Sequence, residues 1–155
     1  MTTPDMDPEI ERALETFNEY DLDSHMDEFA PEATFLDPVL EEPVSGEEHQ
    51  EYLVEIFDAF PDIHQEPQRA FQADEATVVE STFYGTHQGS LEGIPPTGET
   101  VSVPLVSIIK VSDDGITSWR DYWDQQTFRE QLGLTFPAVI GHLPRFARWK
   151  LSKTF

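Results

Sequence analysis

The sequence predicts an α+β fold in which a cone-shaped, curved antiparallel sheet packs against three N-terminal helices, in the order α-α-β-α-β-β-β-β. Apolar residues recur at helical spacing through most of the first 60 residues, whereas alternating and β-branched segments fill residues 64–123. Helices first and strands afterwards are typical of the α+β class. The 155 residues, of which 38% are hydrophobic, suffice for one domain with a buried core.

The first two helices are indicated by capping residues and apolar spacing. Asp7-Pro8 places a capping residue before a proline at the first helical position. Apolar residues then repeat at helical spacing to about Tyr20. A shorter helix follows and ends at Pro31, and its inward-facing side chains are Leu22, Met26 and Phe29. Residues 33–37 are expected to form a short strand.

A third helix and four strands complete the predicted domain. Ser45 with Glu48 three residues later forms a capping box, and Pro61 ends the helix. Four strands are expected after it, separated by turn-forming residues, over 64–73, 77–87, 101–111 and 116–123. A short helix near residues 127–132 is expected to end the domain at Gly133.

The composition excludes several classes of function. Thirty-one Asp and Glu against nine Lys and Arg give a net charge of −22, which repels nucleic acid and, over most of the surface, anionic membranes. The absence of cysteine excludes disulfides, thiolate metal sites and cysteine nucleophiles. No apolar run approaches the about 18 residues of a spanning helix, and the acidic N-terminus is unlike a signal peptide, so we expect a cytoplasmic protein. An acidic surface poor in lysine is typical of halophilic proteins, which work in concentrated salt.

The last 25 residues differ from the rest of the chain in charge. The first 130 residues carry a net charge of −26, whereas the last 25 carry +4 and contain no acid. We therefore expect a cone domain over residues 1–133 and a basic, apolar extension over residues 134–155. The extension is expected to dock on its own acidic domain or on a second copy in a homodimer or higher homo-oligomer. A membrane surface or an external acidic partner is the alternative.

Strand parity singles out one carboxylate as a candidate acid or base. On the last strand Trp119, Asp121 and Trp123 share one face. If that face points inward, Asp121 lies between two indoles, where desolvation raises its pKa towards neutrality. The alternative is a structural Asp121 that pairs with an arginine. His87, which shares a face with Phe83, is the second candidate, either as a proton shuttle or as a hydrogen-bonded pocket histidine.

Metal and cofactor sites are not expected. The five histidines never occur at i, i+4 with a second ligand, and a run that imitates a calcium loop has Met26 where the loop needs glycine. We find no phosphate-binding loop, dinucleotide fingerprint or nucleophile elbow. Instead, aromatic side chains are expected to line a pocket for a small apolar molecule: Phe57, Phe60, Phe83, Trp119 and Trp123.

Several short motifs then occur in a fixed order along the chain: Phe35-Leu36-Asp37-Pro38, Phe60-Pro61-Asp62, Gly85-Thr86-His87-Gln88-Gly89, Gly93-Ile94-Pro95-Pro96-Thr97-Gly98, residues 116–124 and Gln131-Leu132-Gly133. In this order they resemble the SnoaL-like polyketide cyclases of the nuclear-transport-factor-2-like superfamily. The resemblance covers about residues 8–134 and implies the same α+β cone. The sequence departs from it at Ser81, where relatives commonly have tryptophan.

The resemblance also implies a reaction. Such cyclases close a ring by intramolecular aldol condensation without metal or organic cofactor, and an aspartate on the last strand serves as acid and base. Asp121 matches that position, Asp124 is the alternative, and His87 would contact a substrate oxygen. The implied function is a polyketide or ester cyclase for a small apolar keto substrate. The alternatives are a non-catalytic protein that binds an apolar ligand, and an epoxide hydrolase, although the Arg-x-Asp that such enzymes pair with the aspartate is missing.

Overall fold

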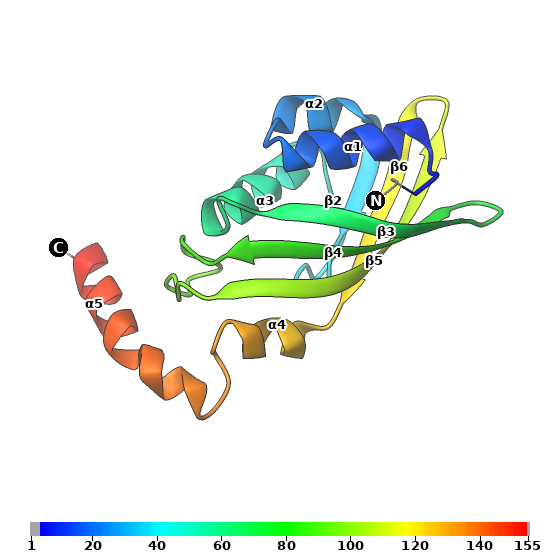
Figure 1. Ribbon diagram of the computed structural model, residues 1–155. Coiled ribbons are helices and arrows are strands. Elements are labelled where there is room, and N and C mark those ends of the chain that lie inside the picture. Colours follow the sequence, from blue (N-terminus) through cyan, green and yellow to red (C-terminus); the bar gives the residue numbers. More distant parts are fainter. Residues whose placement is uncertain (1–3, 155) are drawn as a thin grey trace.

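The computed structural model describes residues 4–154 and confirms the α+β class (Figure 1). Helices α1 (Pro8–Asn18), α2 (Leu22–Asp27) and α3 (Gly46–Ala59) lie together over one face of a curved sheet. The strands of the sheet are β1 (Phe29–Leu36), β2 (Val44–Ser45), β3 (His64–Gln72), β4 (Thr77–Thr86), β5 (Thr100–Ser112) and β6 (Gly115–Trp123). Their order across the sheet is β2-β1-β6-β5-β4-β3.

The sheet is mixed rather than wholly antiparallel. The meander from β3 to β6 is antiparallel, as predicted, and so is the pairing of β1 with the short strand β2, which the sequence did not predict. In contrast, β1 lies parallel to β6, with Phe35 opposite Trp119. The antiparallel prediction is wrong for this pair. No hairpin joins the two strands, so their order in the sequence does not reveal the direction of pairing.

The second helix ends earlier than the sequence predicts. It stops at Asp27, whereas Phe29 and Pro31 belong to β1. Proline lacks the N–H that a strand ladder requires. A register shift between Phe29 and Thr34 interrupts the pairing of β1 with β6 at this point, so the strand accommodates the proline.

The two predicted N-cap residues, Asp7 and Ser45, directly precede helices, but their side chains do not cap them. Helices α1 and α3 begin directly after Asp7 and Ser45, yet neither side chain bonds to its own helix. Asp7 instead accepts a 2.6 Å hydrogen bond from Thr77 Oγ1 at the start of β4. This bond lowers the pKa of the Asp7 carboxyl and ties the start of α1 to the sheet.

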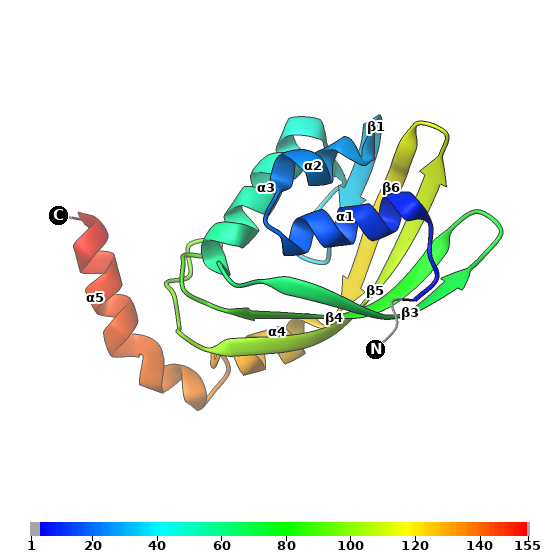
Figure 2. The same cartoon turned by 45° about the horizontal axis from the view of Figure 1, so that its top comes forward.

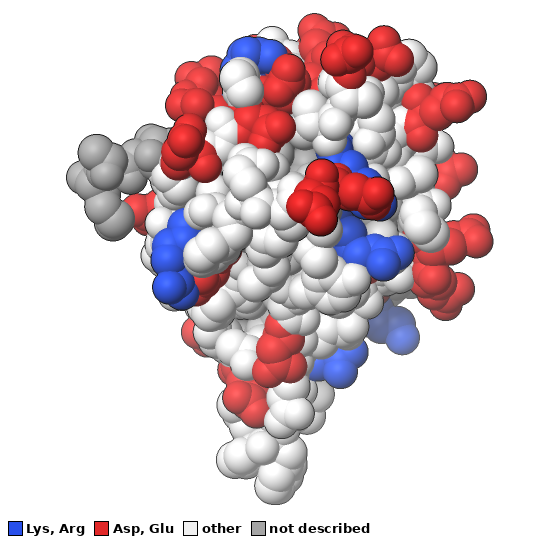
Figure 3. Space-filling model, turned by 90° about the vertical axis from the view of Figure 1, so that its right-hand side faces the viewer, with Lys and Arg blue, Asp and Glu red and all other residues white. Residues whose placement is uncertain are grey.

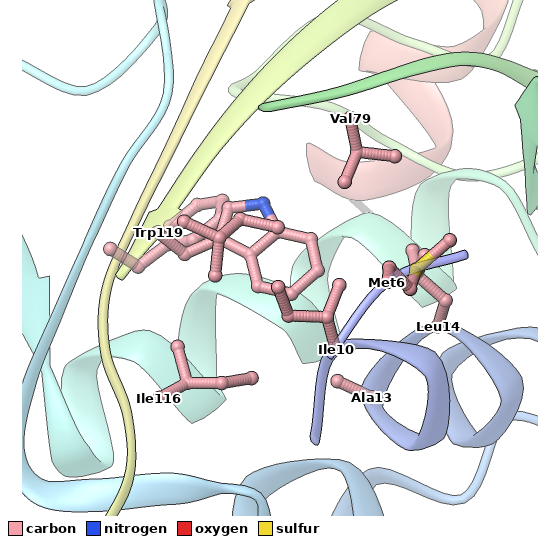
Figure 4. Close-up of a cluster of buried hydrophobic side chains, with 9 residues drawn as sticks. Met6, Ile10, Ala13, Leu14, Val79, Ile116 and Trp119 are labelled. Carbon is pink, nitrogen blue, oxygen red and sulfur yellow. The ribbon is translucent and has the colours of Figure 1, made fainter. Parts of the chain in front are cut away.

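The main core lies where α1 meets the sheet (Figure 4). Side chains from the N-terminal segment and α1 pack against β1, β4, β5 and β6, and the buried members of this cluster are Met6, Ile10, Ala13, Leu14, Phe35, Val79, Ile109, Ile116 and Trp119. A second cluster gathers around Phe60 at the end of α3 and includes Val103 and Leu132. Residues of both clusters line one cavity, so the core is divided rather than continuous.

The C-terminal segment stands apart from the domain. After α4 (Gln125–Gln131) the chain forms a short 3-10 helix, η1 (Ala138–His142), and helix α5 (Leu143–Thr154). Two views show α5 away from the sheet and from the first three helices (Figures 1 and 2). Near its start, the Arg145 guanidinium donates to the Thr97 carbonyl, and His142 Nε2 is 3.8 Å from Glu99 Oε1. These contacts fit docking on its own domain, but the division at Gly133 stays a prediction.

Acidic side chains are spread over the surface. On the face in Figure 3 they form several separate groups with few basic side chains between them. This distribution agrees with the lack of any single acidic block in the sequence. Within residues 4–154, no helix is both long enough and apolar enough to cross a membrane.

Candidate active site

A cavity of about 190 Å³ lies between the helices and the inner face of the sheet. Apolar side chains from α1, α3, β1, β4, β5, β6 and α4 form most of its wall. The polar residues that also line it are His25, Asp37, His49, Tyr52, Glu55, Gln65, Glu92, Asp121, Gln125 and Arg129. An apolar enclosure with a few polar groups is the usual form of a small-molecule site.

The last strand presents alternate side chains to this cavity, as its period of two predicts. Trp119, Asp121 and Trp123 line the cavity, whereas Arg120 and Tyr122 are exposed on the other face. On the cavity side of β6, the Asp121 carboxylate therefore lies between the indoles of Trp119 and Trp123.

Asp121 is held by two donors from neighbouring strand positions. Its Oδ1 accepts a 2.5 Å hydrogen bond from Ser107 Oγ on β5 and a 2.8 Å bond from Trp119 Nε1. Burial raises the pKa of Asp121 to about 7; the two hydrogen bonds oppose this rise, and the nearby Asp37 carboxyl adds to it. The side chain lines a cavity with mainly apolar walls, so its charge is poorly solvated. Asp121 can therefore gain and lose a proton near neutral pH.

Asp37 is a second cavity carboxyl that our sequence analysis did not single out. It directly follows β1, and its Oδ2 accepts a 3.0 Å hydrogen bond from Trp123 Nε1 while its Oδ1 accepts one of 2.9 Å from the Val39 amide. Burial raises its pKa despite these bonds. Phe35 and Asp37 share a strand face, so strand parity could have indicated that Asp37 points inward. The sequence could not have indicated that Asp37 lies near Asp121, because this depends on the parallel pairing of β1 with β6.

The two indoles of β6 thus hold one carboxyl each. Trp119 donates to Asp121, and Trp123 donates to Asp37. The Tyr52 hydroxyl on α3 also interacts with Asp37, and burial raises the pKa of Tyr52, so that this hydroxyl stays protonated. Two neighbouring carboxyls in an apolar wall do not readily ionise together, since each charge disfavours the other.

His87 lies behind the wall of the cavity, not in it. It is fully buried, its Nδ1 is 3.1 Å from Thr97 Oγ1, and its ring stacks on Phe60 with 5.4 Å between the ring centroids. Phe60 lines the cavity, but His87 is not among the described residues that do so. Burial lowers its pKa. The structure therefore does not bring His87 to Asp121, and it connects His87 with the loop that contains Thr97.

Asp124 faces solvent and begins a helix. Its carboxylate accepts from the Gln126 and Thr127 amides and from Thr127 Oγ1 at 2.7 Å. The Thr127 hydroxyl holds the pKa of Asp124 below its usual range. This carboxylate is therefore the N-cap of α4, and its pKa is shifted in the opposite direction from that of Asp121.

Four of the five predicted aromatic lining residues do line the cavity: Phe60, Phe83, Trp119 and Trp123. The fifth, Phe57, packs instead against Phe17 and Tyr20, with ring centroids 5.1 and 5.8 Å away. It lies on the side of α3 that faces α1.

Two histidines on the helix side of the cavity, His25 and His49, were also not singled out from the sequence. The spacing of His49 from Leu53, one helical turn later on the inner face of α3, could have indicated it. Among the residues that the structure describes, no three His, Cys, Asp or Glu side chains are arranged to hold a metal ion.

An α+β cone with carboxyls in an apolar cavity between the sheet and its helices defines the nuclear-transport-factor-2-like class. A protein of ketosteroid isomerase-like fold from Catenulispora acidiphila, solved in complex with trimethylamine, has a TM-score of 0.70 at 20% identity, over 88% of this chain and 97% of that chain. Within this class, the chain belongs to the SnoaL-like polyketide cyclase family, whose model matches residues 9–132. The predicted family and fold are therefore confirmed.

Two further proteins to which the chain is similar are described as cyclases. IdmH of Streptomyces antibioticus, a candidate polyketide cyclase, has a TM-score of 0.70 at 25% identity, over 81% of this chain and 96% of that chain. The aklanonic acid methyl ester cyclase DnrD of Streptomyces peucetius is 36% identical over 62 residues. That match spans 40% of this chain and 43% of DnrD, so less than half of the curated relative is covered.

Proposed function

We propose that this protein is a cofactor-independent acid/base enzyme that closes a ring in a small apolar keto ester. The observation that carries the proposal is Asp121, a carboxyl with a pKa of about 7 in the wall of an apolar cavity. Family membership and the partial similarity to an ester cyclase support the same class of reaction. Fold and family alone do not establish an activity, so the chemistry is argued from the cavity.

The proposed step is an intramolecular aldol reaction. Ionised Asp121 takes a proton from a carbon between two carbonyl groups, and the electron pair left behind forms an enolate. The enolate carbon attacks a second carbonyl of the same molecule, which forms a carbon–carbon bond and leaves an alkoxide. Protonated Asp121 then returns its proton to that oxygen, so that no redox partner is needed.

Asp37 assists this step through its charge. The pKa of both carboxyls is raised, but only that of Asp121 reaches about 7 and the Asp37 charge adds to that rise, so Asp37 ionises first and Asp121 holds the proton that the pair shares near neutral pH. Pairs of carboxyls that cannot both ionise provide an acid and a base at one pH. The pair is best treated as one titrating unit that shares a proton.

The apolar walls contribute by confining the substrate. Rings such as Phe83 and Trp123, whose centroids are 6.2 Å apart, leave little polar surface to hold water beside the reacting carbon. Fixing both reacting carbons of one molecule in such a space is worth up to roughly 7–11 kcal/mol in favourable systems.

His87 and Asp124 stay predictions as catalytic residues. Their positions favour other roles in the proposed enzyme: His87 supports Phe60 and the Thr97 loop, and Asp124 caps α4.

Hydrogen–deuterium exchange at an acidic carbon tests the proposal without the natural substrate. Ethyl 2-methylacetoacetate has one proton between two carbonyls, and its loss in D2O is followed by proton NMR. We expect the wild-type protein to accelerate this exchange and Asp121→Asn to reduce the acceleration about 10²- to 10⁴-fold. Asp124→Asn is the matched control and is expected to retain it. Equal rates for wild type and Asp121→Asn would overturn the proposal.

A non-catalytic binding protein is the second candidate function. The largely apolar, aromatic lining of the cavity favours it, because such a wall can grip a ligand without chemistry. Under this alternative Asp121 is a buried hydrogen-bond acceptor, and no variant at this position changes the exchange rate.

A further inference from the structure

The start of α5 is fixed on its own domain. The Arg145 guanidinium donates a hydrogen bond to the Thr97 carbonyl. The His142 ring lies against Gly133, where a Cβ atom would come within 2.5 Å of its Nε2. The same ring stacks on Phe146, with 5.8 Å between the ring centroids and a 14° angle between the planes. These contacts determine where α5 leaves the domain.

Most of α5 extends away from the domain. Among the described elements, it packs mainly against η1, which directly precedes it in the chain. Two views show its later turns apart from the sheet and from the first three helices (Figures 1 and 2). A helix of 12 residues is marginal in water without tertiary packing. A surface outside this chain that packs against α5 would therefore stabilise it.

An apolar stripe runs along α5 beside basic side chains. Leu143, Ala147 and Leu151 follow one another at intervals of four, so they lie on one side of the helix. Leu143 and Leu151 are 53% and 57% exposed, and Ala147 between them is also exposed. Arg148 is exposed beside this stripe, and α5 contains no acidic residue. The helix therefore fits a surface that combines apolar side chains with carboxylates.

The outer face of α3 is such a surface. Five of the 14 residues of this helix are exposed acids. Glu47, Glu51, Val54 and Asp58 recur at intervals of three or four, so they share one side of α3, and Val54 is 43% exposed. The ion pairs of the described residues involve carboxylates outside α3. The charge and the apolar content of this face both complement α5.

A second copy of the chain is the partner that these two surfaces favour. The fixed start directs α5 away from α3 of its own chain (Figures 1 and 2). The first 130 residues carry a net charge of −26, which repels an anionic membrane and attracts the last 25 residues, which carry +4. A helix of 12 residues, about 18 Å long, covers less than the about 1,200 Å² of a stable interface. Two copies related by a two-fold axis exchange both helices and so double the buried area.

We propose that α5 docks on the outer face of α3 of a second copy, which docks its own α5 in return. The apolar stripe of α5 then covers Val54, and the bases of α5 lie against the carboxylates of α3. The exchange also explains why the two parts of the chain differ in charge, because the basic extension of one copy neutralises acids of the other. The inference does not use the proposed reaction.

Light scattering after size-exclusion chromatography of the full chain measures the assembly. We expect the wild-type protein to have the mass of two chains of 17.7 kDa. Arg148→Glu with Lys153→Glu reverses charges on α5, and Glu47→Lys with Glu51→Lys reverses them on α3, so each pair should raise the dissociation constant at least about tenfold. The variant with all four changes is complementary again and should regain most of the loss. Lys110→Glu, at an exposed base on β5, is the matched control and should change nothing.

A crosslink distinguishes a second copy from the same chain. The chain has no cysteine, so single cysteines can be introduced without side reactions. Ala147→Cys is in the middle of the α5 stripe, and Val54→Cys is on the outer face of α3. A mixture of these two variants, treated with a short bismaleimide, should give a crosslinked pair of chains. Asp113→Cys, in the exposed turn between β5 and β6, replaces Val54→Cys in the control mixture and should give none.

Several results would contradict the exchange of helices. A monomeric wild type, or a dimer whose dissociation constant is unaffected by the reversals on α5 and α3, overturns the inference. Crosslinking of the α5 and α3 cysteines at the level of the control mixture also overturns it. Binding of a monomer to phosphatidylglycerol vesicles that is lost in Arg148→Glu with Lys153→Glu would assign α5 to a membrane surface instead. None of these measurements involves turnover, so the inference and the proposed function fail separately.

Discussion

Asp121 and Asp124 are three residues apart and have opposite environments. Asp121 is inside β6 and faces the cavity, where burial raises its pKa to about 7. Asp124 follows the end of the same strand, where helix-capping hydrogen bonds lower its pKa. The chemistry of a carboxyl in this acidic chain is therefore set by the wall around it, and the large negative charge of the protein says little about it.

The same contrast separates the cavity from the surface as a whole. Asp37 and Asp121 are each held by an indole N–H and are poorly solvated. Hydroxyl donors lower the pKa of the better solvated carboxyls of Asp7 and Asp124, whereas the Ser107 hydroxyl at Asp121 does not offset the effect of burial. Of the 31 acidic residues, Asp37 and Asp121 are the two whose pKa burial raises, and that of Asp121 reaches about 7.

The largest effect that tests the contrast between Asp121 and Asp124 is expected in the pH dependence of the unfolding free energy. The folded pKa of Asp121, about 7, is above its unfolded value near 3.9, so the protonated form favours the folded state. That contribution is complete below about pH 4 and is lost as pH rises through about 7. Asp121→Asn has no such loss, so its unfolding free energy minus that of wild type should grow between pH 4 and 8, by up to about 4 kcal/mol.

Urea unfolding at several pH values measures this difference. Asp124→Asn provides the control with the opposite sign, because a lowered pKa stabilises the fold at neutral pH and that contribution is lost as pH falls. A pH-independent difference between Asp121→Asn and wild type would mean that Asp121 is solvated and ordinary.

A smaller effect is expected when the hydroxyl donor of each carboxyl is removed. Ser107→Ala removes a bond that opposes the raised pKa of Asp121, so the pH midpoint of carbon-acid exchange should move to higher pH by about one unit. Thr127→Val removes the corresponding donor to Asp124 and should raise the Asp124 pKa without moving that midpoint. Carboxyl ¹³C NMR titrations distinguish the two sites. A midpoint that moves equally in both variants would contradict the separation.

Strand period explains how much of this site the sequence could predict. Alternation along residues 119–123 placed Asp121 between two indoles, and the structure agrees. Asp37 and Asp124 each come one residue after the end of a strand, β1 or β6, and still follow its alternation, whereas His87, one residue after β4, does not line the cavity that Phe83 lines. The pairing of Asp37 with Asp121 depends on a parallel contact between distant strands, which no local pattern encodes.

Removal of the Asp124 cap is expected to cause a modest loss of stability. Asp124→Ala removes the acceptor for two amides at the start of α4, and we expect a melting temperature about 3 °C lower. The exchange rate per folded molecule should not change, because the carboxylate faces solvent rather than the cavity. A loss of exchange in a folded Asp124→Ala protein would instead restore Asp124 as the alternative catalytic residue.

The smallest effect is expected from added salt. Salt screens the surface carboxylates but not the enclosed carboxyl of Asp121, so it distinguishes the surface from the cavity. Ions reduce repulsion between surface carboxylates, so raising KCl from 0.05 to 2 M should increase the melting temperature of this chain of net charge −22. The same salt reaches an enclosed carboxyl poorly, so the Asp121 titration midpoint should move by less than about half a unit. If the Asp121 midpoint instead follows ionic strength as closely as the surface acids do, then bulk solvent enters the cavity. The raised pKa would in that case reflect the charge of the whole surface, not the apolar wall.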